Sequence, residues 1–442
     1  MSHGQDHTYS RDEVTALIQR QPIPARHKLI ALVLAVVGFA VFVLGVVMGQ
    51  ERAWQAFHVN WLFFTTISSS AVALAAVQRI TTARWSRAVN RMQEGFVAWL
   101  PIAFVLLAVA LLFGKTAIFP WIDDPPTIHA KQVWLEPTTF TIRNIIVFGI
   151  IVALSMRFVW NAVRLDVGVL PEWGAAWAKG IRGRMRSGFG AERRELHSTH
   201  SRQGKVAVFL VIAFGYGWTM LAWDLSMSLD WHFQSTMYGW QVFMGGWIGW
   251  LMVYAVLLRL WRNFLGAHDV ITETHFWDVG KLCFAFTAFW GYLTFAQYLI
   301  IWYGNWGEET HFFRLRLIEP WTGLTVAIAV LMFVVPFFTL LSKSAKIYTP
   351  VMTVVSLCGI VGLWIHRYIE VYPSIYVTPN ALPLGLWELM IFLGFGGLWA
   401  WSYMQFMDAF PRIGVVLLTS PYRDEVQVPC DPVTMEPLPA HE

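Results

Sequence analysis

Ten long runs of apolar residues, separated by polar connections, constrain this chain more than any other feature. Each run is about 20 residues long, the length that an α-helix needs to cross the hydrocarbon core of a bilayer. Only 14% of the residues are charged, and most of these fall between the runs. Because backbone polar groups must be satisfied internally in lipid, each run predicts a membrane-spanning helix. The runs are 28–49, 57–77, 97–114, 141–163, 205–227, 236–259, 281–303, 321–342, 350–369 and 385–407.

The sequence therefore predicts an all-α, polytopic integral membrane protein, whose orientation follows from its Lys and Arg residues. The connections after runs two, four, six and eight are basic, whereas the opposite connections carry Asp123, Asp124, Asp230, Glu308 and Glu309. We therefore expect the N-terminus and the C-terminus on the cytoplasmic side. The basic residues are Arg79, Arg84, Arg87, Arg91, Arg164, Lys179, Arg182, Arg184, Arg186, Arg193, Arg194, Arg202, Arg259, Arg262, Lys281, Lys343 and Lys346.

The runs divide the chain into five segments. The polar N-terminal segment contains Ser10 and Glu13 at capping-box spacing, which predicts a short amphipathic helix on the membrane surface. Four spans, a basic cytoplasmic loop, six spans and a Pro-rich cytoplasmic tail follow. Spans 2–5 and spans 6–9 begin on the same side, so we expect two four-helix bundles flanked by spans 1 and 10. The five segments are 1–27, 28–163, 164–204, 205–407 and 408–442.

Sequence patterns that bind redox centres are missing. Cys283, Cys358 and Cys430 form neither CxxC nor CxxCH, the patterns of clusters and attached haems. His58 and His366 lie in or near spans, and we expect both to bond backbone or water rather than haem iron. We therefore expect no metal, haem or iron–sulfur cluster in this chain and no catalytic residue. The net charge of +4 is too small to indicate binding of nucleic acid.

Ionisable residues gather near the predicted outer face. Asp224 lies inside span 5, and Glu388 lies in the first turn of span 10. Charged groups are costly in lipid and usually face the bundle interior or a wet cavity. We interpret this group as an outer proton half-channel, with solvated or salt-bridged interfacial residues as the alternative. The members are Asp224, Asp230, His232, His366, Glu370 and Glu388.

Three separated blocks between residues 223 and 310 carry a family pattern. The blocks are Trp223–Asp230 (WDLSMSLD) with His232, Ser235, Thr236, Tyr238 and Gly239; Asp278–Phe286 (DVGKLCFAF); and Phe295–Asn305 (FAQYLIIWYGN) with Glu308, Glu309 and Thr310. Together they resemble the F subunit of bacterial alternative complex III. Family members often have Pro-His-Trp where this chain has Trp231, His232 and Phe233.

The resemblance implies a subunit of a quinol:electron-acceptor oxidoreductase in the respiratory or photosynthetic electron transport of a bacterial cytoplasmic membrane. In that family, multihaem cytochrome c and iron–sulfur subunits lie on the outer side and hold the redox cofactors. Two polytopic subunits, distantly similar to the membrane anchor of polysulfide reductase, lie in the bilayer. The other polytopic subunit is the usual candidate for the main quinol site. The F subunit is expected to be non-catalytic, to support the complex, and to be a candidate for proton translocation.

Direct quinone binding is an alternative function. A quinone head needs an apolar slot with one or two polar groups for its carbonyl oxygens. Gln241, Gln297, Tyr298 and His232 are the candidates, and ordinary hydrogen bonds between packed helices are the opposing interpretation.

A stand-alone secondary transporter is the second alternative. Transporters usually show broken helices and charged groups at the membrane midplane. Here the midplane offers neutral groups such as Thr287, Thr294 and Ser356. A hydroxyl group holds a water molecule but stores no proton at neutral pH. We therefore expect no continuous carboxylate path across the membrane within this chain.

Overall fold

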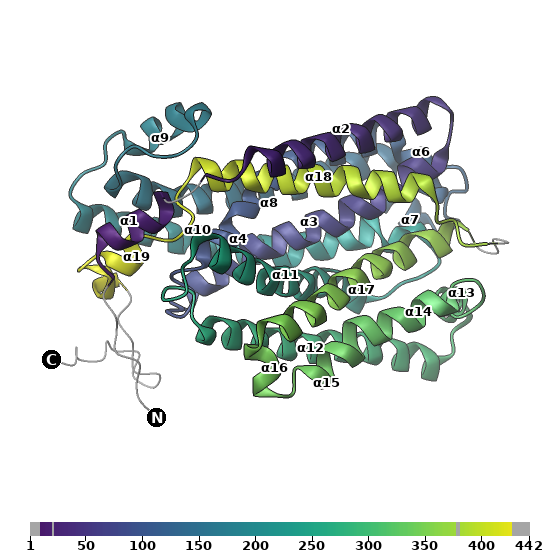
Figure 1. The fold of residues 1–442 in the computed structure, drawn as a ribbon. Coiled ribbons are helices and arrows are strands. Elements are labelled where there is room, and N and C mark those ends of the chain that lie inside the picture. Colours follow the sequence, from purple (N-terminus) through teal and green to yellow (C-terminus); the bar gives the residue numbers. More distant parts are fainter. Residues whose placement is uncertain (1–8, 20–21, 377–380, 427–442) are drawn as a thin grey trace.

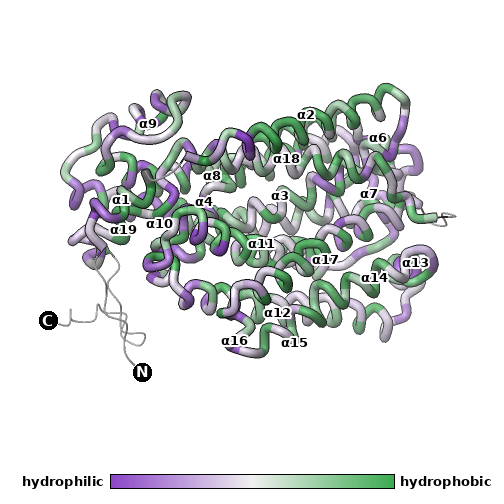
Figure 2. The backbone as a smooth tube through the Cα atoms, viewed as in Figure 1, coloured by the Kyte–Doolittle hydropathy of each residue, from purple (hydrophilic) through white to green (hydrophobic). Residues whose placement is uncertain are grey.

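The computed structural model describes residues 9–19, 22–376 and 381–426, and helix is the only regular structure in these ranges. Nine of the described helices are long and apolar enough to cross a membrane. The predicted fold class is confirmed at this level: the chain is an all-helical, multi-pass membrane protein. Figure 2 shows hydrophobic residues along the middle of the bundle and hydrophilic residues toward its two ends.

The nine spans follow the first nine apolar runs, and two of them contain a short π-helical stretch. The spans are α2 Ala25–Val47; α3 Glu51–Ile80; α4 Asn90–Glu94 with η1 Gly95–Ala98, α5 Trp99–Val109, η2 Ala110–Gly114 and α6 Lys115–Ile118; α8 Pro137–Val169; α10 Glu192–Leu225 with η5 Met227–Leu229; α11 Thr236–Leu265; α12 Glu273–Gly304; α14 Thr322–Ile328 with η6 Ala329–Val334 and α15 Val335–Thr339; and α17 Thr349–Ile375.

The tenth predicted span is also a helix, α18 (Leu386–Ala409), but it is not among the nine apolar helices. Helix α18 nevertheless runs beside α2 (Figure 1). The number of ten spans therefore stays a prediction.

Helices α8 and α10 extend beyond their apolar runs, so much of the loop predicted at 164–204 is helical. The segment between them contains η4 (Ala176–Ala178) and α9 (Lys179–Arg186). Helices α1, α9 and α19 lie at one end of the bundle, and α6, α7 and α13 lie at the other (Figure 1). The remaining short helices are α1 Arg11–Gln19, η3 Pro120–Ile122, α7 His129–Trp134, α13 Gly307–Arg316, α16 Lys343–Ile347, α19 Val416–Thr419 and η7 Arg423–Val426.

The two terminal segments pack against the bundle where they are described. The capping box at α1 is confirmed, because the Ser10 N–H donates to Glu13 and the Glu13 N–H donates to the Ser10 hydroxyl. Val14 of α1 is fully buried, as are Ile413 and Val415 in the first part of the predicted tail. The rest of the Pro-rich tail, 427–442, lies outside the described residues.

Helix α3 forms the centre of the protein. The whole of its most apolar stretch is buried, and it contacts α5, α10, α11, α17 and α18. Two of its buried polar side chains are hydrogen-bonded within the core: the Thr66 and Ser68 hydroxyls donate to carbonyls one turn earlier, and the Trp399 indole N–H donates to the Ser68 oxygen. Because α3 also contacts α11 and α17, the division into two bundles stays a prediction.

Glycines set how closely helices approach. A Cβ atom at Gly38 would overlap the Gly394 backbone, and one at Gly397 would overlap the Ala31 carbonyl, so α2 and α18 pack backbone to backbone. Gly394 and Gly397 thus allow the close approach of helices that is typical of small residues in membrane bundles. Gly396 differs, because a Cβ there would meet only the Phe64 ring, at 3.5 Å.

Candidate functional site

A cavity of about 700 Å³ lies among α11, α12, α13, η6 and α17. Most of its wall is aromatic or aliphatic, including Tyr238, Phe312 and Phe313. Two lining residues, Tyr292 and Phe295, are each 62% exposed on the outer surface of the bundle. The cavity is therefore open sideways, toward the region that lipid surrounds in a membrane protein.

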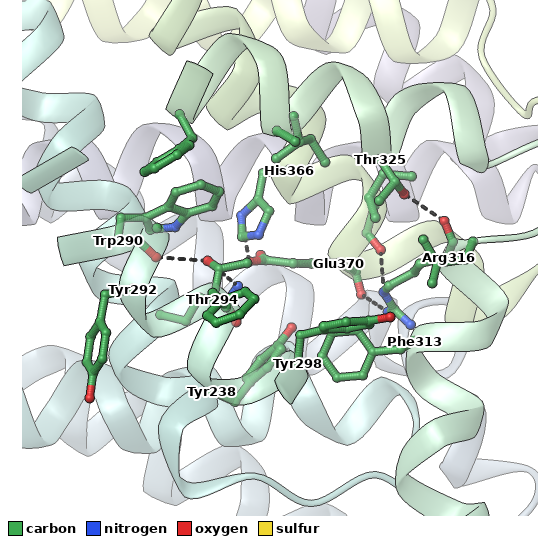
Figure 3. A pocket seen from close by; sticks show the side chains of 18 of the residues that line it. Tyr238, Trp290, Tyr292, Thr294, Tyr298, Phe313, Arg316, Thr325, His366 and Glu370 are labelled. Atoms are coloured by element: carbon green, nitrogen blue, oxygen red, sulfur yellow. Dashed lines mark hydrogen bonds and ion pairs between the residues drawn. The ribbon is translucent and has the colours of Figure 1, made fainter. Parts of the chain in front are cut away.

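Helix α17 supplies the charged part of the cavity. Figure 3 shows His366 pointing toward Glu370, and the His366 Nδ1 atom lies 3.0 Å from the Glu370 Oε1 atom. The two residues share a face because four residues make about one helical turn. The fully buried Arg367 donates to both carboxylate oxygens of Glu370 at 2.6 Å and to the Val242 carbonyl oxygen at 2.5 Å. Glu370 therefore has a cation on one side and an imidazole on the other.

Arg316 joins α13 to the end of α17. Its guanidinium donates to the carbonyl oxygens of Phe312, Ile369 and Glu370 and to the Ser374 hydroxyl. Burial lowers the pKa of Arg316 to about 10, so this group stays charged at neutral pH. Its positive charge acts on both Glu370 and Asp230.

Three further polar groups face the middle of the cavity. Gln241 donates to the Thr294 hydroxyl, which itself donates to the Trp290 carbonyl oxygen. The buried Trp290 indole N–H has no hydrogen-bond partner among the described residues, although buried N–H groups rarely lack one. This indole is therefore a donor that a bound molecule or a water can use.

The structure brings together four of the residues selected from the sequence. Gln241, Tyr298, His366 and Glu370 all line the cavity. Gln297 instead lines a separate groove of about 500 Å³ beside Trp223 and Glu309. His232 is half exposed and stacks on Trp231 with the ring centroids 3.6 Å apart. Adjacent residues of a helix face different directions, so Gln297 cannot share the site of Tyr298.

Asp224 and Glu388 lie in ion pairs away from the cavity. Asp224 accepts from Arg143 Nε at 2.8 Å and also from Trp134 and Asn144. Glu388 accepts from Arg52, from the Tyr372 hydroxyl at 3.0 Å and from the Gly385 N–H. These contacts agree with the alternative interpretation of Asp224 and Glu388, in which they are salt-bridged residues and not part of a proton half-channel.

Asp230 is placed differently from Asp224 and Glu388. Its carboxylate lies 3.7 Å from the Nδ1 atoms of both His232 and His311. The side chains of His232 and His311 are 50% and 41% exposed. Asp230, near Arg316, therefore connects the charged end of the cavity to the surface.

Sequence reasoning missed the arginines that organise these carboxylates. Arg367 was detectable, because it lies within a predicted span three residues before Glu370, and a charge there needs a partner. Arg52 and Arg143 were not detectable from the sequence, because the carboxylates that they contact, Glu388 and Asp224, lie far away in the chain. A second missed cluster lies at the α9 end, where the buried Arg91 contacts Glu94 and Asp166 at 2.7 Å each.

The fold and the cavity define a multi-pass helical membrane protein with a laterally open, largely apolar site. In the described ranges, no group of three His, Cys, Asp or Glu side chains is arranged to hold a metal ion. A comparison with models of protein families gives no match, and neither does a comparison with curated proteins.

Proposed function

We propose that this chain is a membrane subunit of a quinol:electron-acceptor oxidoreductase of the alternative complex III type, and that its cavity binds the quinone. The single observation that carries the quinone site is the lateral cavity with the His366–Glu370 pair on its wall. The family assignment rests on the three sequence blocks that resemble the F subunit.

The cavity has the size and the lining of a site for a lipid-soluble ring compound. Pockets for small molecules measure about 300–1,000 Å³ and combine apolar walls with a few polar groups; this one measures about 700 Å³. The lateral opening at Tyr292 and Phe295 lets an isoprenoid tail remain in the bilayer. The Trp290 indole and the His366 imidazole are the donors for the quinone carbonyl oxygens.

Quinol oxidation releases two protons and two electrons. In this proposal, the electrons pass to haem or iron–sulfur centres of the partner subunits that the resemblance implies. His366 accepts the two protons one after the other and passes on the first before it accepts the second, and the Glu370 carboxylate 3.0 Å away stabilises the imidazolium that forms each time. Both protons leave past Asp230 to His232 or His311, so the outer half-channel comprises these residues and excludes Asp224 and Glu388.

The quinone site is tested by filling the cavity. Ala288 lines it, whereas Ala285, one turn earlier on α12, is exposed and does not. In the purified chain, quinone should quench tryptophan fluorescence with saturable affinity. Ala288→Phe should lower that affinity by about tenfold or more, and Ala285→Phe should leave it unchanged. Equal affinities in the two variants would reject the cavity as the site.

Membership of a complex is tested by purification from native membranes. The proposal expects haem-containing and iron–sulfur subunits to purify with this chain, together with a second polytopic subunit. If the chain purifies alone while retaining its native fold, a stand-alone transporter replaces the proposed function.

A further inference from the structure

Two apolar grooves meet on α18, at the end of the bundle where α2 begins. The larger, of about 630 Å³, lies among α3, α11, α17 and α18, and the smaller, of about 270 Å³, lies between α2 and α18. We call them the paired grooves. Both are lined by His27, Phe392, Gly396, Ala400 and Met404. The paired grooves therefore share one wall on α18, and both reach the exposed His27; we call this end the opening.

The length of the paired grooves matches one leaflet of a bilayer. From Phe392 to Met404, α18 rises roughly 18 Å at about 1.5 Å per residue. Half of a hydrocarbon core of about 30 Å is about 15 Å. The indole N–H groups in the larger groove are hydrogen-bonded within the protein, since the Trp261 N–H donates to the Tyr403 hydroxyl at 2.9 Å and the Trp399 N–H donates to the Ser68 hydroxyl oxygen at 2.8 Å. The lining is therefore suited to alkyl chains.

The opening of the paired grooves is basic. Arg26 and His27 are exposed in the first turn of α2, and the described residues contain no ion pair of Arg26. The next basic residue, Lys28, is held by Asp408 at 2.5 Å. The α9 end also carries most of the Lys and Arg residues, which predicts that it faces the anionic cytoplasmic leaflet.

We propose that the paired grooves bind one anionic diacyl phospholipid, with one acyl chain in each groove and the headgroup phosphate beside Arg26 and His27. The exposed Arg26 and His27 beside an apolar lining match a phosphate joined to acyl chains, which favours a lipid over a partner helix as the occupant. Two narrow grooves with one opening fit two chains joined at one headgroup.

The proposed position of the acyl chains is tested by a substitution at Gly396. An added side chain there enters the shared part of the grooves with little strain, because its Cβ meets only Phe64, at 3.5 Å. Gly215 on α10 provides the matched control, since a Cβ there meets nothing within 4 Å and Gly215 lines neither groove. Gly396→Leu and Gly215→Leu thus add the same side chain inside and outside the grooves.

The experiment measures lipids retained by the purified full-length chain. The chain is equilibrated with equimolar phosphatidylglycerol and phosphatidylcholine of identical acyl chains, and native mass spectrometry counts the bound lipids. The parent chain should retain one phosphatidylglycerol, favoured about fivefold over phosphatidylcholine, the effect of one basic group near an anionic headgroup. Gly396→Leu should lose this lipid, and Gly215→Leu should keep it.

The charge at the opening is tested separately with a surface variant that leaves the core intact. Arg26→Glu should abolish the preference for phosphatidylglycerol, whereas Arg184→Glu, exposed on α9, should retain it. The proposal is overturned if the parent retains both lipids equally or none, if Gly396→Leu retains as much as Gly215→Leu, or if Arg26→Glu keeps the preference.

Discussion

The His366 imidazole and the Glu370 carboxylate approach within 3.0 Å on the wall of the cavity, one turn apart on α17. Arg367, between them in sequence, is fully buried and holds the other side of the carboxylate. A base and an ion pair thus sit where a lipid-soluble molecule can reach them from the side of the bundle.

The Arg367–Glu370 pair should be essential for stability. Removing one partner of a buried ion pair leaves the other charge uncompensated and costs about 3–5 kcal/mol. Glu370→Gln should lower the free energy of unfolding by about that much, measured by denaturant titration in micelles. Glu308→Gln, exposed in the first turn of α13, should change it by less than about 0.5 kcal/mol. Similar stability in both variants would show that Arg367 has another counter-charge.

Substitutions at Asp230 and Asp224 should have different effects, the first on proton release and the second on stability. In the assembled complex, Asp230→Asn should slow quinol turnover and proton release, because Asp230 connects the cavity to His232 and His311. Asp224→Asn should weaken the contact with Arg143 and lower the unfolding midpoint, with turnover unchanged. If only Asp224→Asn slows turnover, the protons leave between α8 and α10 instead.

Three glycines of the α2–α18 contact should respond differently to one methyl group. Gly38→Ala and Gly397→Ala force backbones apart, and overpacking of this kind costs about 1–3 kcal/mol. Gly396→Ala places its methyl group in open groove and should be nearly neutral. Thermal unfolding of the purified variants gives the order, and a large loss at Gly396 would contradict the described packing.

Glu136, at the start of α8, should stabilise the folded state in a pH-dependent way. Hydrogen bonds from the backbone N–H groups of Thr139 and Thr138 lower the pKa of its carboxyl to about 2 from 4.5. Because the folded-state pKa is lower, the stabilisation is complete above pH 4.5 and is lost as the pH falls toward 2. Glu136→Gln should therefore lower the unfolding midpoint at pH 7, and the difference should shrink below pH 4.5. A difference that is constant from pH 7 to pH 3 would contradict this.

The spans were predictable because each depends on local sequence. An apolar run of sufficient length must form a helix in lipid, and nine of ten runs meet the criteria of length and hydropathy. Helix ends were less predictable: α10 begins at Glu192, well before its apolar run, because contacts with protein support its polar first turns.

The candidate site was only partly predictable, because helical periodicity pairs residues within one helix and not between helices. The four-residue spacing of His366 and Glu370 is enough to place them on one face of a helix. The partners of Asp224 and Glu388 come from α8 and α3, and no spacing rule connects them. Tyr298 and Gln297 were selected together, yet adjacent positions of α12 face different cavities.

The most direct test of the central claim is photoaffinity labelling of the purified chain with an azidoquinone, followed by peptide mapping. The account predicts labelling of the cavity walls, within 288–298 on α12 and 366–370 on α17, that excess quinone displaces and Ala288→Phe abolishes. Displaceable labelling confined to α8 and α10, or labelling that excess quinone does not displace, would contradict it.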